Sequence, residues 1–299
     1  MVHHNVCPLC SSEKIGPQFT CTDHFVSNKE FPVFKCSECE FLFTQDSPEE
    51  AEIAGFYESD SYISHSDTSK GFSNKIYRLA RSVMLDKKKK LIKKLTGLEK
   101  GTVLDIGSGT GYFAGSMKKA GWNAKGIEIN AKARQFSIAH FGLDITAPDK
   151  ISDLESGSFD CVTLWHVLEH FHHPFNYLSE IRRLLKPGGV CVIALPNCHS
   201  YDAEHYKEYW AAWDVPRHLW HFKPSTFRIF SEKTQLLLSG NPLTLPLDVF
   251  YISQLSEKYK GSSLPFLKGI SVAIIFTFLS VFTKERSSSV IYVLRKSIV

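Results

Sequence analysis

One segment constrains the fold of this 299-residue chain more than any other, because it joins a buried-type strand to a glycine-rich turn. It reads Val103-Leu-Asp105-Ile-Gly107-Ser-Gly109-Thr-Gly111-Tyr-Phe. The apolar, β-branched beginning predicts a strand, and the residues after the turn predict the start of a helix. Because glycine has no Cβ, Gly107 and Gly109 allow left-handed backbone dihedrals and a close approach to a ligand. The segment therefore predicts a strand–turn–helix unit with a binding turn.

The same alternation of strand and helix continues along the chain. Short apolar runs predict strands at Thr102–Ile106, Lys125–Ile129, Phe159–Trp165 and Gly189–Leu195. Amphipathic stretches that end at glycine or Lys-Pro-Gly-Gly predict helices at Tyr112–Ala120, Ala131–Phe141 and Pro174–Leu185. Such alternation is typical of an α/β fold with a mostly parallel sheet. We expect a sixth strand near Leu247–Ile252 and a seventh at Ser289–Leu294, inserted beside the sixth.

A carboxylate follows the second predicted strand. Glu128 lies 21 residues after Gly107, where a Rossmann-type unit hydrogen-bonds the hydroxyls of a nucleoside ribose. The turn has the spacing Gly-x-Gly-x-Gly, whereas a dinucleotide enzyme needs Gly-x-Gly-x-x-Gly to seat a pyrophosphate on the helix N-terminus. The pair predicts a nucleoside pocket that is not built for a dinucleotide.

Asp105-x-Gly107-x-Gly109-x-Gly111 resembles the first motif of class I S-adenosylmethionine-dependent methyltransferases. Ser158–His170 and Leu185–Asn197 look like the fourth strand and the Pro-Gly-Gly entry to the fifth strand of that family. The resemblance implies a Rossmann-like, doubly wound, mostly parallel seven-stranded sheet. It also implies that Glu128 binds the ribose of the cofactor and that His166 binds the cofactor nearby. Four residues would bind its methionine end: Asp105, Gly107, Gly109 and Gly111.

His166, Glu169 and His170 form a first group of candidate catalytic residues. They would share one helix face at the carboxyl edge of the sheet if a helix begins near Trp165. The segment resembles the ubiquinone-biosynthetic O-methyltransferase subgroup, whose Glu-x-x-Glu-His run can hold a divalent cation. Here His166 replaces the first acid, so the sequence leaves open whether a catalytic cation is bound. Capping of the helix by Glu169 and His170 is the alternative.

A second group follows the fifth predicted strand, in the segment Trp210–Phe222. Asp214, Arg217, His218 and His221 could orient an acceptor or take its proton, because histidine titrates near neutral pH. The alternative for Asp214 and Arg217 is an ion pair that only holds the loop together. We count His218 and His221 among the candidate catalytic residues.

Two Cys-x-x-Cys pairs near the amino terminus predict a metal site. Cys7, Cys10, Cys36 and Cys39 match the spacing of a tetrahedral zinc-thiolate centre, with Cys21 and His24 as weaker alternatives. Residues 1–45 are too few for an adequate core, so we expect a zinc-ribbon-like module in which the ion is structural. The first residues lack a signal-peptide pattern, and reduced cysteines favour the cytoplasm.

The remaining divisions are a linker with a basic helical segment (46–100), the cofactor-binding core (101–240) and the last strands with an apolar insertion (241–299). The basic segment, Lys75–Leu95, is typical of a solvated helix, with anionic partners as the alternative. Gly269–Thr283 is an uncharged run of 15 residues, shorter than the roughly 20 needed to cross a bilayer. It could be buried, form a dimer contact, bind a lipid-like acceptor or touch a membrane through residues 265–283.

Net charge is only +4, so there is no strong signal for nucleic-acid binding. The resemblance implies a methyltransferase that uses S-adenosylmethionine, and the His-rich edge favours O-methyl transfer to a small or lipid-linked metabolite. Two alternatives stay open at this point. The first is methylation of RNA or protein, and the second is a zinc-ribbon binding protein whose cofactor domain is not catalytic.

Overall fold

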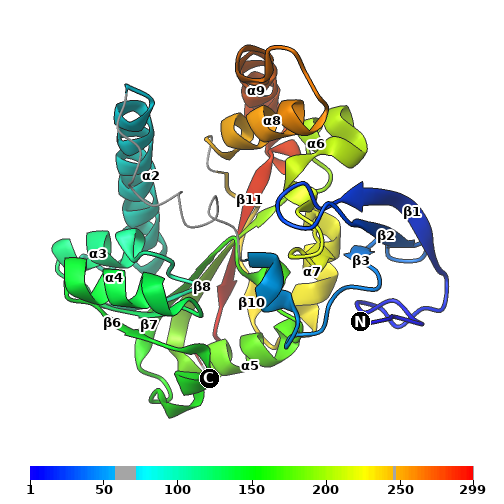
Figure 1. Cartoon of the computed structure of the whole chain (residues 1–299). Helices are drawn as coiled ribbons and strands as arrows, with labels where there is room; N and C mark the ends of the chain where they lie inside the picture. The colour runs from blue at the N-terminus through cyan, green and yellow to red at the C-terminus, as the bar shows by residue number, and fades with distance from the viewer. Residues whose placement is uncertain (58–71, 245–246, 299) are drawn as a thin grey trace.

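The fold is known from a computed structural model, which describes residues 1–57, 72–244 and 247–298. Its centre is a seven-stranded sheet in the order β10-β11-β8-β7-β4-β5-β6 (Figure 1). The neighbours from β8 to β6 run parallel, and β11 is antiparallel to both β8 and β10. The strands are β4 (Thr102–Ile106), β5 (Asn123–Ile127), β6 (Asp144–Thr146), β7 (Phe159–Trp165), β8 (Leu185–Pro196), β10 (Leu237–Leu238) and β11 (Ser289–Arg295). The predicted Rossmann-like, mostly parallel seven-stranded sheet is confirmed.

Successive strand residues point to opposite faces of the sheet, so the apolar strands present side chains on both faces. Helices cover both of these faces. Val103 packs with α2 and α3 in one hydrophobic cluster, whereas Leu104 packs with α5 and α7 in another. This division gives the doubly wound architecture. The helices of the described chain, apart from short 3-10 turns, are α2 (Phe72–Thr96), α3 (Tyr112–Lys119), α4 (Ala131–Phe141), α5 (Pro174–Leu184), α6 (Tyr201–Tyr206), α7 (Pro224–Glu232), α8 (Asp248–Tyr259) and α9 (Pro265–Phe282).

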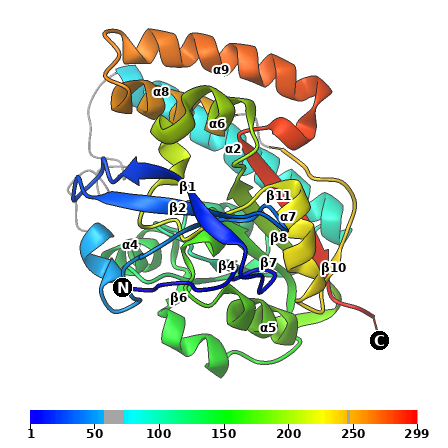
Figure 2. The ribbon, with the colours of Figure 1, turned by 90° about the vertical axis from the view of Figure 1, so that its right-hand side faces the viewer.

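A second, four-stranded antiparallel sheet carries the amino-terminal cysteines. It is built from β1 (Ile15–Thr22), β2 (Glu30–Cys36) and β3 (Leu42–Thr44), and its last strand is β9 (Trp220–His221). Phe43 of β3 pairs with Trp220 of β9, so the core domain donates a strand to the module. The two parts share one hydrophobic cluster and pack side by side (Figure 2).

The expected sixth strand near Leu247–Ile252 is wrong, because Asp248–Tyr259 forms helix α8. Its buried positions follow the helical spacing i, i+3, i+4, i+7 and i+8: Val249, Ile252, Ser253, Ser256 and Glu257. The strand beside β11 is instead β10, only two residues long. Two of these buried residues are serines, which are polar, so the sequence does not show a helical hydrophobic pattern. The remaining apolar residues therefore suggested a strand.

The apolar segment lies between two paired strands, but the first of them is β10 and not the strand expected near Leu247–Ile252. Leu237 and Leu238 of β10 pair with Arg295 and Leu294 of β11, and Leu243 still bridges Ile291 before the chain leaves the sheet. This excursion contains α8 and α9, which stand at one end of the molecule (Figures 1 and 2). Part of the expected linker, residues 58–71, lies outside the described residues. The basic segment that follows it forms α2.

Candidate active site

The glycine-rich turn between β4 and α3 has the backbone that its sequence predicts. Gly107, Gly109 and Gly111 have φ angles of 68°, 54° and 75°, which side-chain-bearing residues rarely adopt. A Cβ on Gly107 would lie 2.4 Å from a methyl group of Val167, so this position also needs the missing side chain for space. At Gly109 a Cβ would have no neighbour within 4 Å. The turn is therefore tight on one side and open at Gly109.

Glu128 lies directly against this turn, as the spacing predicts. One carboxylate oxygen accepts a 2.7 Å hydrogen bond from the Gly109 N–H, and the other accepts a 2.8 Å bond from the Asn130 N–H. The Gly107 and Ser108 N–H groups both donate to the Ile127 carbonyl, at 2.8 and 3.0 Å. The turn and the carboxylate thus form one hydrogen-bonded unit at the carboxyl edge of the sheet.

Asp105 occupies the floor of the turn and is only 2% exposed. Burial raises the pKa of its carboxyl to about 7, although a 2.6 Å hydrogen bond donated by the Thr163 hydroxyl opposes the shift. Lys88 also opposes it through its positive charge. The site therefore holds a carboxyl poised to change its charge near neutral pH.

Lys88 of α2 belongs to the site, although the basic segment that contains it is typical of a solvated helix. Its ammonium lies 4.1 Å from the centre of the Trp165 ring. Burial lowers the pKa of Lys88, while Asp248 and Asp105 oppose that shift. A signal was present, because Leu85, Lys88, Ile92 and Leu95 recur at helical spacing and share one face. Because Lys88 is one of four consecutive lysines, Lys87–Lys90, its inward position is hard to recognise in the sequence.

His166 follows the end of β7 with a φ of 58°, and α8 supplies its partner. Nε2 of His166 lies 3.2 Å from a carboxylate oxygen of Asp248, and Nδ1 lies 3.7 Å from Glu169. Burial by itself would lower the pKa of His166, but the interactions with Asp248 and Glu169 outweigh burial and raise it to about 9. The ring is therefore cationic at neutral pH. Asp248 could not be found from the sequence, because its segment looked like a strand.

The helix expected to begin near Trp165 is wrong. β7 continues to Trp165, and the next regular element is a 3-10 turn at Leu168–His170. The left-handed backbone of His166 turns the chain before a full helical turn can form. His166 and Glu169 still meet, whereas His170 points toward the segment Trp210–Phe222.

Glu169 is the most deeply buried charge of the cluster, at 1% exposed. Within the described part of the chain, neither of its carboxylate oxygens has a hydrogen-bond partner. Burial would raise the pKa of this carboxyl, but the three nearby imidazoles, with His166 foremost, hold it below the ordinary value. A buried, ionised carboxylate with free lone pairs can accept a proton or hold a cation.

His170 and His218 complete this cluster, with ring centres 4.6 Å apart. Nδ1 of His218 lies 2.8 Å from the Ala212 carbonyl, which can only accept, so the neutral ring carries its proton on Nδ1 and leaves Nε2 free. Nε2 faces Glu169 at 3.9 Å. Burial lowers the pKa of His170 to about 4, so this ring is neutral. Glu169, His170 and His218 each offer a ligand atom within 4.8 Å of the others.

His221 lies in β9, apart from the cluster. Its Nε2 is 3.0 Å from the hydroxyl of Thr44, its ring packs on Trp213, and burial lowers its pKa to about 3. These contacts hold His221 within the four-stranded sheet, against the turn that carries Trp213.

Arg217 ties the amino-terminal module to the loop that carries His218. It is 2% exposed, and its guanidinium lies 2.9 Å from Asp23 of the module and 2.6 Å from Asp214. It also donates to the Phe56 carbonyl at 3.0 Å. The expected Asp214–Arg217 pair is present, and Asp23 makes it a buried triad.

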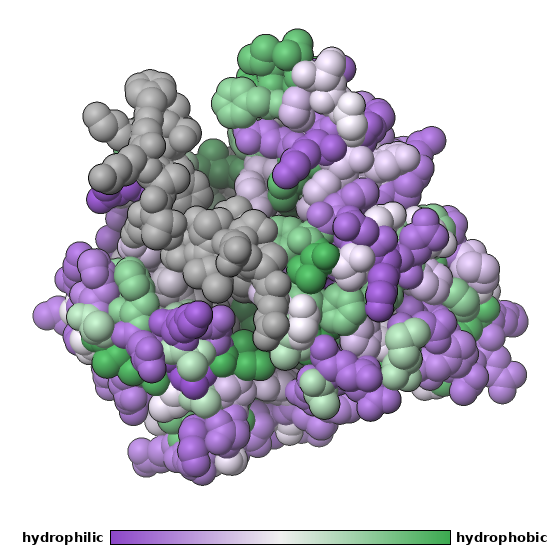
Figure 3. Space-filling model, viewed as in Figure 1, coloured by the Kyte–Doolittle hydropathy of each residue, from purple (hydrophilic) through white to green (hydrophobic). Residues whose placement is uncertain are grey.

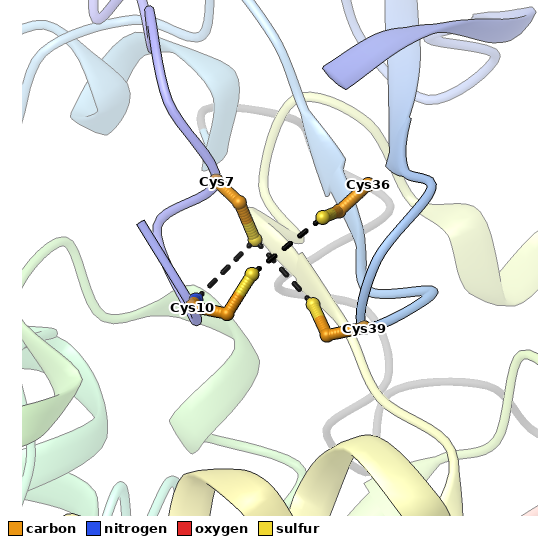
Figure 4. A group of neighbouring side chains, drawn as sticks. All are labelled: Cys7, Cys10, Cys36 and Cys39. Atoms are coloured by element: carbon orange, nitrogen blue, oxygen red, sulfur yellow. Dashed lines mark hydrogen bonds between the residues drawn. The ribbon is translucent and has the colours of Figure 1, made fainter. Parts of the chain in front are cut away.

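The four cysteines of the Cys-x-x-Cys pairs converge (Figure 4). Sulfur–sulfur distances are 3.6 Å for Cys7 and Cys39 and 3.6 Å for Cys10 and Cys36, and all four sulfurs lie within 4.8 Å of one another. Four thiolates at about 2.3 Å from a tetrahedral zinc lie about 3.8 Å apart, so the group fits a structural zinc ion. Cys21 lies elsewhere and donates to the Glu208 carbonyl at 3.5 Å.

Comparisons with known proteins agree with this geometry. A family model described as a methyltransferase domain matches residues 77–236, more than half of the chain. A ubiquinone biosynthesis O-methyltransferase of Caulobacter vibrioides is 32% identical over 178 residues, 54% of this chain and 67% of that protein. The protein of the same name from Ralstonia nicotianae is 35% identical over 94 residues, which cover 29% of this chain and only 40% of the relative.

A solved structure shares the fold at low sequence identity. It is the Haemonchus contortus phosphoethanolamine N-methyltransferase 2 in complex with S-adenosyl-L-methionine, with a TM-score of 0.51 and 16% identity. The match covers 86% of this chain and 62% of that one. Together with the matched domain and the glycine turn beside Glu128, these similarities lead to one assignment. The chain belongs to the methyltransferase-domain family, as a class I member of the S-adenosylmethionine-dependent methyltransferases.

Proposed function

We propose that this protein transfers the methyl group of S-adenosylmethionine to an oxygen of a small-molecule acceptor. The observation that carries the proposal is the hydrogen-bonded unit of Gly109 and Glu128, with open space at Gly109. When bound, the cofactor supplies an electrophilic methyl group on a sulfonium. The chain's own residues must then hold the reactants in line, exclude water and remove a proton.

Two residues at the floor suit the amino-acid end of the cofactor. Asp105 offers a buried carboxyl for an ammonium group, and Lys88 offers a half-buried ammonium for a carboxylate. Glu128 would hold the ribose hydroxyls, and the glycine turn would provide backbone close to the cofactor. Each end of an adenosylated amino acid thus has a partner of opposite or complementary character.

The proton of the acceptor can go to His218. Its Nε2 carries the free lone pair of the neutral ring and lies 3.9 Å from Glu169, whose negative charge would stabilise the imidazolium that forms. His166 stays cationic and paired with Asp248, so it suits electrostatic orientation rather than proton removal. A divalent cation on Glu169, His170 and His218 would be an alternative way to activate an acceptor oxygen.

The relatives and the apolar helix support a finer proposal for the acceptor. The curated relatives are named for ubiquinone biosynthesis, and α9 presents apolar residues to solvent. We therefore propose a lipid-linked acceptor, modified by a cytoplasmic enzyme that contacts the membrane peripherally through residues 265–283.

Calorimetry with S-adenosylmethionine tests the cofactor assignment. Loss of a hydrogen bond to a charged group costs about 1.5–3 kcal/mol, so Glu128→Gln is expected to weaken binding roughly 10- to 100-fold. Glu155→Gln, which changes an exposed carboxylate, is the matched control and should bind normally. Unchanged affinity in Glu128→Gln would count against the assignment.

A fractionated transfer assay tests the acceptor. With labelled methyl donor and cell extract, we expect label in the chloroform-soluble fraction, and loss of it in Glu128→Gln. Label in precipitated protein or RNA would contradict a small-molecule acceptor. Cofactor binding without any transfer would contradict a catalytic role.

A further inference from the structure

Helix α9 exposes an apolar surface that water does not favour. It is 18 residues long with a mean hydropathy of 1.9, and only 11% of these residues are buried. By length and composition it is the one helix of the described chain that could cross a membrane. Seven large side chains of α9 are more than half exposed: Phe266, Leu267, Ile274, Ile275, Phe278, Val281 and Phe282. They gather at one end of the molecule (Figure 3).

The topology excludes a single crossing by α9. β11 begins at Ser289, soon after α9 ends, and it pairs with β8 along its length and with β10 at Leu294 and Arg295. One crossing would place β11 on the opposite side of the bilayer from the strands to which it is hydrogen-bonded. The helix is also about 27 Å long at 1.5 Å per residue, less than the roughly 30 Å of a bilayer core. A membrane-bound α9 must therefore lie along the surface.

Charges around α9 favour an anionic surface. Residues 258–284 contain four lysines and no acidic residue: Lys258, Lys260, Lys268 and Lys284. The beginning of α2 rises from the same side of the molecule (Figure 1) and adds Arg78 and the exposed Leu79. Apolar side chains next to lysines are the combination that binds the interface of anionic membranes.

The helix pair α8 and α9 is connected to the active site. Gly269 of α9 lies so close to α8 that a Cβ there would sit 2.7 Å from the Cα of Gln254. The first residue of α8, Asp248, bonds His166. A surface contacted by α9 is therefore connected through one close-packed helix pair to the residues that face the acceptor.

From these observations we infer that α9 docks in the plane of an anionic phospholipid membrane and holds the active site at its surface. The bilayer covers the apolar face, and the lysines contact lipid phosphates. The consequence for substrate choice rests on the proposed methyl-transfer function: an acceptor with an apolar tail reaches the site from the lipid layer without crossing water.

Vesicle co-sedimentation of the full, zinc-loaded chain tests the docking. The probes are phosphatidylcholine vesicles with and without phosphatidylglycerol. We expect binding to the anionic vesicles that weakens with added salt, and a loss of at least about tenfold in Phe278→Glu/Phe282→Glu. Ile138→Glu, on the exposed face of α4, is the control and should bind like the wild type.

Two results would overturn the inference. One is a wild-type chain that stays in the supernatant with both vesicle types at low salt. The other is a wild-type dimer in light scattering that the double glutamate variant converts to a monomer, with no vesicle binding by either. Calorimetry with S-adenosylmethionine on the same samples separates the two proposals, because the double variant lies outside the cofactor site. Absent cofactor binding would remove the proposed function and leave the docking result intact.

Discussion

Replacing Arg217 by methionine tests whether the cysteine-rich amino-terminal module and the loop that carries His218 depend on one another. Methionine keeps much of the buried volume and removes the charge. Breaking a buried ion pair costs about 3–5 kcal/mol, because the remaining charge is left without a partner. Asp23 keeps the hydrogen bonds from the Phe25, Val26 and Ser27 backbone N–H groups, and Asp214 is 27% exposed. We therefore expect the lower end of this range, about 3 kcal/mol.

Urea unfolding of the zinc-loaded chain, followed by tryptophan fluorescence, measures this free energy. Lys14→Met is the matched control, because Lys14 pairs with Glu38 on the same module at 71% and 50% exposure. Such an exposed pair contributes about 0–1 kcal/mol. In a double-mutant cycle, Asp23→Asn should cost much less in the Arg217→Met background than in the wild type. If Arg217→Met unfolds within about 1 kcal/mol of the wild type, the buried triad does not hold the two parts together.

Three further changes test the turn, the histidine pair and the metal centre. Gly107→Ala should lose about 1–3 kcal/mol of stability together with cofactor binding. Gly157→Ala, at a φ of 63° with no neighbour within 4 Å, is the control and should lose stability alone. Equal cofactor affinity in both variants would be evidence against the turn as the binding element. The pKa of His166 is raised from 6.5 to about 9, so its stabilising contribution is complete below about pH 6.5 and is lost as the pH rises through 9. Melting temperatures of the wild type and His166→Gln should converge over that interval, and parallel curves would contradict the Asp248 pairing. Cys36→Ser should reduce zinc, measured by a chromophoric chelator, well below the one ion expected per wild-type chain, and cobalt-loaded wild type should show thiolate charge-transfer absorption.

The local parts of the fold could be predicted from the sequence because short-range sterics determine them. β4, β7 and α4 have the predicted bounds, and the meeting of Gly109 with Glu128 follows from the geometry of a strand–turn–helix unit. Lys88 was within reach of the same reasoning, since its spacing from Leu85 and Ile92 is that of one helix face.

Other parts depend on contacts between distant segments, which periodicity does not record. Asp248 reaches His166 from 82 positions along the chain, and β9 joins β3 across most of the chain. The left-handed backbone of His166 replaces the expected helix with a 3-10 turn, and a histidine at that position does not predict a left-handed backbone. These features come from tertiary packing, which overrides local preference.

The borrowed strand β9 limits how this protein can be dissected. Trp220 and Phe222 pack against Phe41 of the module, at ring distances of 6.2 and 5.3 Å. A fragment without residues 1–45 would uncover those rings, leave the Trp220–His221 backbone without its partner strand and strip Arg217 of a counter-ion. We therefore expect the shortest folded unit to include the cysteine-rich segment, and removal of a bound metal ion to destabilise the whole chain rather than one accessory part.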